Sequence, residues 1–155
     1  MILTIAVVGI LNGQPLPNKY TGFGEDKSPP LKWLGAPPGT KSFALICDDP
    51  DAPGGVWVHW ILWNIPATVA ELPEGLAPVP ESPEGIRQGE NDFGKVGWSG
   101  PTTPPGPAHR YFFRLFALDA PLTLAPGADR RKLLAAMKGH ILAEGHVMAT
   151  FQRPG

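Results

Sequence analysis

The sequence has little cysteine and little charge, with no excess of either sign. Its one cysteine, Cys47, cannot form an internal disulfide, and the apolar run 43–46 before it indicates a buried thiol, which fits a reducing compartment. Thirteen Lys and Arg against 14 Asp and Glu leave a net charge of −1. The basic field that nucleic acid or an anionic membrane surface requires is therefore missing, and any bound anion must be held by local groups.

A long hydrophobic run is also missing. The apolar segment 1–11 falls far short of the roughly 20 residues that span a bilayer. No Lys or Arg precedes it and no small-residue cleavage pattern follows it, as a signal peptide would require. We therefore expect a β-strand here, no transmembrane segment, and a cytoplasmic protein.

Proline and glycine are abundant instead, with 20 and 19 residues, together about a quarter of the chain. They lie between strongly apolar runs and show no period, which favours a folded protein with long, stiff loops over a low-complexity chain. A length of 155 residues predicts a single domain, residues 1–155, with its own core.

Many strand signals and a single helix signal predict the fold class. Runs of β-branched and aromatic residues end at turn residues, and one helix is expected at 128–138, with Gly139 as its stop. This pattern predicts a mainly β protein, an antiparallel β-sandwich of two sheets with one or two short helices and long Pro/Gly-rich loops. The stretch 67–108 has almost no periodic structure, and we expect it to build a site. The expected strands are 1–8, 42–48, 56–65, 109–119 and 140–153.

An acidic corner follows the second of these strands. Asp49 and Asp51 alternate with Pro50 and Pro53, which restrict the backbone and aim the carboxylates in set directions. The peptide bond before either proline could be cis. A plain surface turn remains the alternative interpretation.

A histidine lies within the most apolar strand. With a period of two, His59 shares a face with Trp57, Ile61 and Trp63. A buried imidazole without a hydrogen-bond partner costs about 1–3 kcal/mol, so we expect a partner and favour an aspartate of the acidic corner. That bond would leave the other ring nitrogen for a cavity.

A second histidine follows the long loop. His109 and Tyr111 stand two residues apart and are expected on one face of a strand, with Arg110 on the other. Gly100, within the loop, could offer a backbone N–H to an oxyanion because no side chain obstructs the approach.

Together these stretches resemble the paired signature of the phosphatidylethanolamine-binding, or Raf-kinase-inhibitor-like, family in its short bacterial and archaeal form. The resemblance implies a β-sandwich with a surface pocket for phosphate or a phosphoryl head group. We expect no cofactor and no metal, since no His-Glu-x-x-His or paired-Cys spacing supports a metal site on the Asp and His residues of these motifs. Longer eukaryotic members continue into a helix beside the pocket, so a more open pocket is expected here. The matching motifs are Asp49-Pro50-Asp51-Ala52-Pro53, His59-Trp60, Asn64-Ile65-Pro66, Gly100-Pro101 and His109-Arg110-Tyr111. The implied ligand-binding residues are Asp49, Asp51, His59, Gly100, His109 and Tyr111.

Three interpretations of the pocket stay open. The first is a binding protein for a small phosphate-like or zwitterionic ligand, with weak affinity that rises as the pH falls from about 8 to 6, the range of histidine. The second is a hydrolase using Asp, His and Tyr as acid–base groups, although no nucleophile motif is present. The third is a regulatory module that binds a phosphorylated partner protein. A homodimer is also possible on the strength of the five tryptophans.

Overall fold

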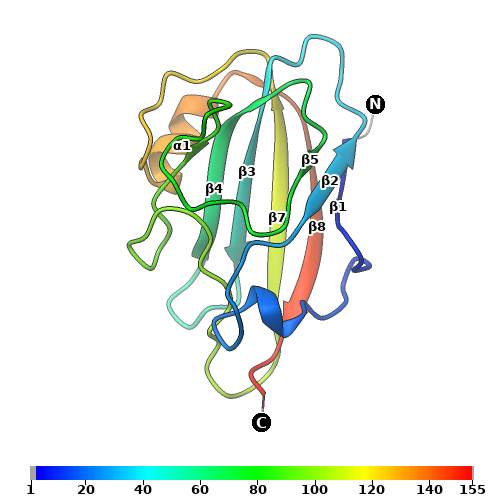
Figure 1. Ribbon diagram of the computed structural model, residues 1–155, viewed down its shortest axis with the longest axis vertical. Helices are drawn as coiled ribbons and strands as arrows, with labels where there is room; N and C mark the ends of the chain where they lie inside the picture. The colour runs from blue at the N-terminus through cyan, green and yellow to red at the C-terminus, as the bar shows by residue number, and fades with distance from the viewer. Residues whose placement is uncertain (1–2, 155) are drawn as a thin grey trace.

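Two antiparallel sheets face each other across a shared core in this computed structural model, which describes residues 3–154 (Figure 1). The mainly β sandwich expected from the sequence is thereby confirmed. The smaller sheet has the order β1 (Thr4–Val7), β2 (Leu31–Leu34), β5 (Glu71–Leu72). The larger has the order β6 (Arg87–Gln88), β4 (Trp57–Pro66), β3 (Ser42–Asp49), β7 (His109–Leu118), β8 (Ile141–Phe151). A 3₁₀ helix, η1 (Asn18–Tyr20), and an α-helix, α1 (Arg130–Met137), complete the elements.

The larger sheet is covered on both faces. Its inner face packs against the smaller sheet, so Leu45 and Phe113 share a cluster with Ile5. Part of its outer face packs under α1, where Leu133 and Met137 meet Trp63. Burial on both faces explains why β3 and β4 are apolar without a simple alternation.

The helix is shorter than the predicted range 128–138. Asp129 lies just before its first turn as the N-cap, and its carboxylate accepts from Lys132 N at 3.0 Å. Leu133 and Met137 are buried as expected, but Leu134 is 38% exposed. Its apolar face is therefore one residue narrower than the sequence indicates.

The five predicted strands correspond to β1, β3, β4, β7 and β8, whose bounds lie within three residues of the prediction, and residues 1–2 of the first predicted strand lie outside the described residues. Sequence analysis missed β2, and it missed β5 and β6 inside the stretch 67–108. The last two have only two residues each, too few to show a period. All peptide bonds of the described residues are trans, those before Pro50 and Pro53 included.

A bulge in β4 changes the predicted faces. Cys47 of β3 pairs with Trp60 and Asp48 pairs with Val58, so His59 is an extra residue on β4. Two neighbours, His59 and Trp60, consequently contact the same ring, that of Trp98. The expectation that His59 shares a face with Ile61 and Trp63 is therefore wrong, because an inserted residue reverses the alternation beyond it.

A second irregularity between β3 and β4 depends on Asn64. Its φ is 56°, a left-handed conformation that asparagine tolerates better than most residues. Its side chain accepts from Leu122 N at 2.7 Å and donates to Leu122 O at 2.9 Å. One side chain thus permits the backbone kink and ties β4 to the segment before α1.

Replacement of Asn64 separates these two effects. N64A should lower the free energy of unfolding by about 2–4 kcal/mol, since it leaves both Leu122 groups without a partner and strains φ. N64G should lose less, because glycine removes only the hydrogen bonds and not the permitted conformation. Urea denaturation measures both, and equal losses would mean that the backbone conformation contributes nothing.

Candidate functional site

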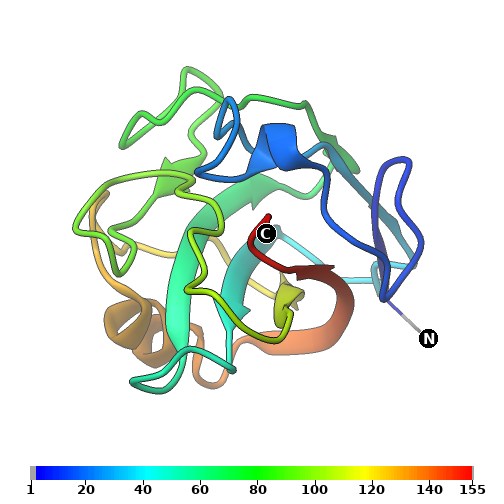
Figure 2. The ribbon, with the colours of Figure 1, turned by 90° about the horizontal axis from the view of Figure 1, so that it is seen from below.

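A cavity of about 490 Å³ opens at the end of the sandwich where β3 ends and β4 and β7 begin. Figure 2 looks onto this end and shows η1 and the loop of residues 89–108 in front of the strands. Stretches distant in sequence supply the walls. The lining residues are Asp49, Ala52, Pro53, Gly54, Val56, Trp57, His59, Asp92, Phe93, Thr102, Thr103, Pro104 and His109.

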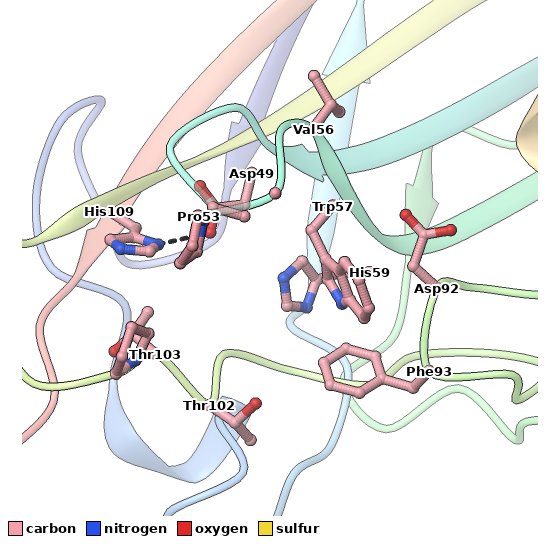
Figure 3. A pocket seen from close by; sticks show the side chains of 13 residues that line it. Asp49, Pro53, Val56, Trp57, His59, Asp92, Phe93, Thr102, Thr103 and His109 are labelled. Carbon is pink, nitrogen blue, oxygen red and sulfur yellow. Dashed lines mark hydrogen bonds and ion pairs between the residues drawn. The ribbon is translucent and has the colours of Figure 1, made fainter.

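The Asp49 carboxylate organises one side of the cavity. Only 3% of Asp49 is exposed. Its Oδ1 accepts from Asp51 N at 2.8 Å, which closes the acidic corner on itself. Its Oδ2 accepts from His109 Nδ1 at 2.7 Å, so the end of β3 orients the first residue of β7 (Figure 3).

Asp51 lies outside the cavity, although the family signature includes it. Its carboxylate accepts from Arg110 N and Nε, both at 2.9 Å, and from Arg110 Nη2 at 2.8 Å. These hydrogen bonds lower the pKa of Asp51. Arg110 and His109 are neighbours in β7 and point to opposite faces of the strand. The Asp51–Arg110 ion pair therefore connects the acidic corner to β7 on the face opposite to His109.

His59 lies on the other side of the cavity from the Asp49–His109 pair (Figure 3). Its Nδ1 is 2.6 Å from Ser99 O. The expected aspartate partner is therefore wrong: a backbone carbonyl of the long loop fixes this ring, because Asp49 is already engaged by His109.

Aromatic rings surround His59. The rings of Tyr111, Phe93 and Trp98 have centroids 5.1, 5.4 and 6.4 Å from the imidazole. This burial lowers the pKa of His59, and the hydrogen bond to Ser99 and the charge of Asp49 only partly oppose it. The nearby carboxylates therefore do not raise the pKa of His59 overall, because desolvation has the larger effect.

The hydrogen bonds of the two imidazoles fix their tautomers. A carbonyl and a carboxylate can only accept, so Nδ1 carries the proton in both His59 and His109. Neither Nε2 has a hydrogen-bond partner within residues 3–154. In the neutral form each Nε2 offers a lone pair to a ligand, and in the protonated form it offers a proton.

Gly100 supports the site through close backbone packing and does not contact a ligand through its N–H. Its N–H donates to Asp26 Oδ1 at 2.7 Å and is not free for an oxyanion. A Cβ at this position would collide with the Tyr20 carbonyl and Asp26. The glycine therefore allows close contact between the long loop and the segment after η1, a contact that Trp98 Nε1 reinforces by donating to Tyr20 O at 3.0 Å.

Tyr111 is fully buried and does not line the cavity. Burial raises the pKa of its phenol well above the ordinary value, and the charge of Asp49 adds to the effect. Tyr111 thus keeps its proton and presents its ring edge-on to His59 at an interplanar angle of 77°. Tyr111 therefore packs against the imidazole of His59 and does not face the cavity.

Sequence analysis did not identify several walls of the cavity. Trp57 and Phe93 form an edge-to-face pair at 5.5 Å, and Asp92 beside them accepts from Val58 N at 2.7 Å. The loop that carries Asp92 is built around Asn91, whose Nδ2 donates to Gly97 O at 2.9 Å. The adjacent residues Asp92 and Phe93 in an irregular loop were the sequence signal that could have identified this wall of the cavity.

Within residues 3–154, the cavity contains neither a thiol nor a cluster of metal ligands. Cys47 is inside β3, where burial raises the pKa of its thiol well above the ordinary value, and it does not line the cavity. Across the part of the chain that the structure describes, no three His, Cys, Asp or Glu side chains gather as metal ligands. No helix of that part is long and apolar enough to cross a membrane.

Comparison with other sequences gives matches over nearly the whole chain. The sequence profile of the phosphatidylethanolamine-binding proteins matches residues 9–152. A UPF0098 protein of Methanothermobacter thermautotrophicus is 49% identical over 138 residues, 89% of this chain and 91% of the relative. Another, of Aquifex aeolicus, is 49% identical over 144 residues, 92% of this chain and 84% of the relative.

Solved structures agree with the sequence matches. A phosphatidylethanolamine-binding protein homologue from Chlamydia trachomatis has a TM-score of 0.89 at 35% identity, covering 99% of both chains. YbcL of Escherichia coli, described as a new member of the mammalian family, also has a TM-score of 0.89, at 32% identity over 99% of this chain and 100% of its own. The chain therefore belongs to the phosphatidylethanolamine-binding protein family, as its paired motifs predict.

Proposed function

We propose that this protein binds a small phosphate-like or zwitterionic ligand in the cavity between His59 and His109. The observation that carries the proposal is the pair of imidazoles, each held through Nδ1 by a protein oxygen and each with Nε2 left for a ligand. The same groups would hold a phosphoryl group carried by a partner protein. Affinity would come from these local groups, since the net charge is −1.

The two imidazoles have different electrostatic surroundings. His109 is 2.7 Å from a buried carboxylate, so a proton on its Nε2 creates an ion pair. His59 has no such contact, and burial lowers its pKa. A proton on His109 Nε2 would give the site a donor opposite the acceptor at His59, which suits a protonated phosphate oxygen.

A cation could occupy the opposite end of the cavity. Asp92 lines this end together with the Trp57–Phe93 pair. A carboxylate beside aromatic faces attracts ammonium groups by charge and by cation–π contact. A zwitterion such as phosphoethanolamine would place its phosphoryl group between the imidazoles and its ammonium near Asp92.

Anion affinity should rise as the pH falls. We expect sulfate to bind about tenfold more tightly at pH 6 than at pH 8, because a protonated imidazole supplies a charged donor and histidine side chains gain a proton over this pH range. Sulfate itself takes up no proton in this range, so isothermal titration calorimetry would report protonation of the protein.

H109A should abolish this pH dependence. His140 provides a matched control, since its Nδ1 is 2.8 Å from Asp119 Oδ1 in an exposed pair away from the cavity. H140A should bind like the wild type at both pH values. Equal wild-type affinity at pH 6 and pH 8 would contradict the role of His109.

The two aspartates of the acidic corner should differ. D49N removes the charge and leaves one acceptor oxygen for the two donors, Asp51 N and His109 Nδ1, so sulfate affinity at pH 6 should fall about tenfold or more. D51N affects only the pair with Arg110 behind the corner, and its loss should stay within about threefold. Isothermal titration calorimetry measures the sulfate affinity of both variants. Equal losses of affinity would place Asp51 in the binding site.

The ligand's cation can be tested through Asp92. We expect wild-type protein to prefer phosphoethanolamine over inorganic phosphate by roughly threefold to tenfold, the size of one partly exposed charge and cation–π contact. D92N should remove this preference while the protein still binds phosphate. The preference is measured as a ratio of dissociation constants, and its survival in D92N would assign the ammonium to another wall.

A further inference from the structure

The hydroxyl of Thr103 is buried without a hydrogen-bond partner. Thr103 is 4% exposed, and its Oγ1 is one of three such side-chain atoms within residues 3–154, with Trp33 Nε1 and Arg130 Nε. Of the three residues, only Thr103 lines the cavity. Buried polar atoms in folded proteins are nearly always paired, so an orphan beside a binding cavity indicates a missing partner.

The loop around Thr103 restricts its backbone. Pro104 follows it, which keeps Thr103 out of the helical region and in an extended conformation. The segment before it is anchored by backbone hydrogen bonds, from Ser99 N to His59 O at 3.2 Å and from Gly22 N to Pro101 O at 2.8 Å. The position of the Thr103 side chain is therefore set before any ligand arrives, and only rotation about χ1 is free to aim the hydroxyl.

The cavity has few side-chain donors for an anion. Asp49 and Asp92 only accept, and the Nδ1 protons of His59 and His109 are already engaged. The threonine hydroxyls and the indole N–H of Trp57, which is 38% exposed, are therefore the lining side-chain groups that can donate without first gaining a proton. Thr102 is exposed, whereas Thr103 is buried. A hydrogen bond from the Thr103 hydroxyl would therefore be stronger than one from the Thr102 hydroxyl, because water is excluded around it.

We propose that Thr103 is a ligand-binding residue whose hydroxyl donates to an oxygen of the bound oxyanion at every pH. The inference rests on the proposed function, since it assigns a further contact in the same cavity. Figure 3 shows Thr103 next to His109, on the side of the cavity where the phosphoryl group would lie. Binding would give the orphan hydroxyl the partner that the protein itself does not supply.

The test uses a variant of the same shape. T103V replaces the hydroxyl by a methyl group and should weaken sulfate and phosphate binding about tenfold or more, at pH 8 as well as at pH 6, as loss of a hydrogen bond to a charged group predicts. T103S keeps the hydroxyl and should bind within about threefold of the wild type. The control T123V alters an exposed threonine that does not line the cavity, and its affinity should be unchanged.

Thermal unfolding of the ligand-free proteins supplies a second readout. T103V should melt at the same temperature as the wild type or higher, because it removes an unpaired buried hydroxyl. Weaker binding with unreduced stability supports the proposal, whereas a fall in the melting temperature of T103V that T103S does not show would mean that the hydroxyl has a structural partner and overturn it. Wild-type binding that T103V leaves intact overturns the assignment of Thr103 alone. A wild-type protein that binds neither anion overturns the proposed function and this inference with it.

Discussion

The hydrogen bond between Asp49 Oδ2 and His109 Nδ1 joins the last residue of β3 to the first residue of β7. Because Asp49 is almost fully buried, its charge can be accommodated only with close partners. The carboxylate meets this requirement from two sides, with Asp51 N and with His109. The same contact that makes the buried charge tolerable therefore fixes the tautomer and direction of an imidazole at the cavity.

The second imidazole is directed by backbone irregularity. The bulge in β4 adds His59 to the strand and sets it beside Trp60 on the inner side. A regular strand would have alternated these two side chains. Bulges are frequent beside functional sites because they redirect one side chain without breaking the sheet, and here the bulge carries the ring that Ser99 O then holds.

The abundance of glycine and proline has a structural explanation in the loops below the sandwich. Gly22 and Gly100 allow the segment after η1 to approach the long loop more closely than any side chain would permit. Asp26 and Tyr20 then accept from groups of that loop. Proline restricts the remaining backbone around Thr103. The cavity wall is held in place without regular secondary structure, since backbone and side-chain hydrogen bonds replace a sheet ladder.

The mainly β class, five of the eight strands within residues 3–154, the helix and the family were all readable along the chain, because hydrophobic periodicity and short motifs are local properties. Local signals also identified Asp49, His59 and His109. Contacts between distant segments decided the rest. They gave His59 a carbonyl in place of an aspartate, turned Asp51 towards Arg110, and occupied the N–H of Gly100. A hydrogen bond depends on which segments lie close together in space. A one-residue bulge changes which side chains face each other, although it leaves the hydrophobic pattern of the sequence almost unchanged.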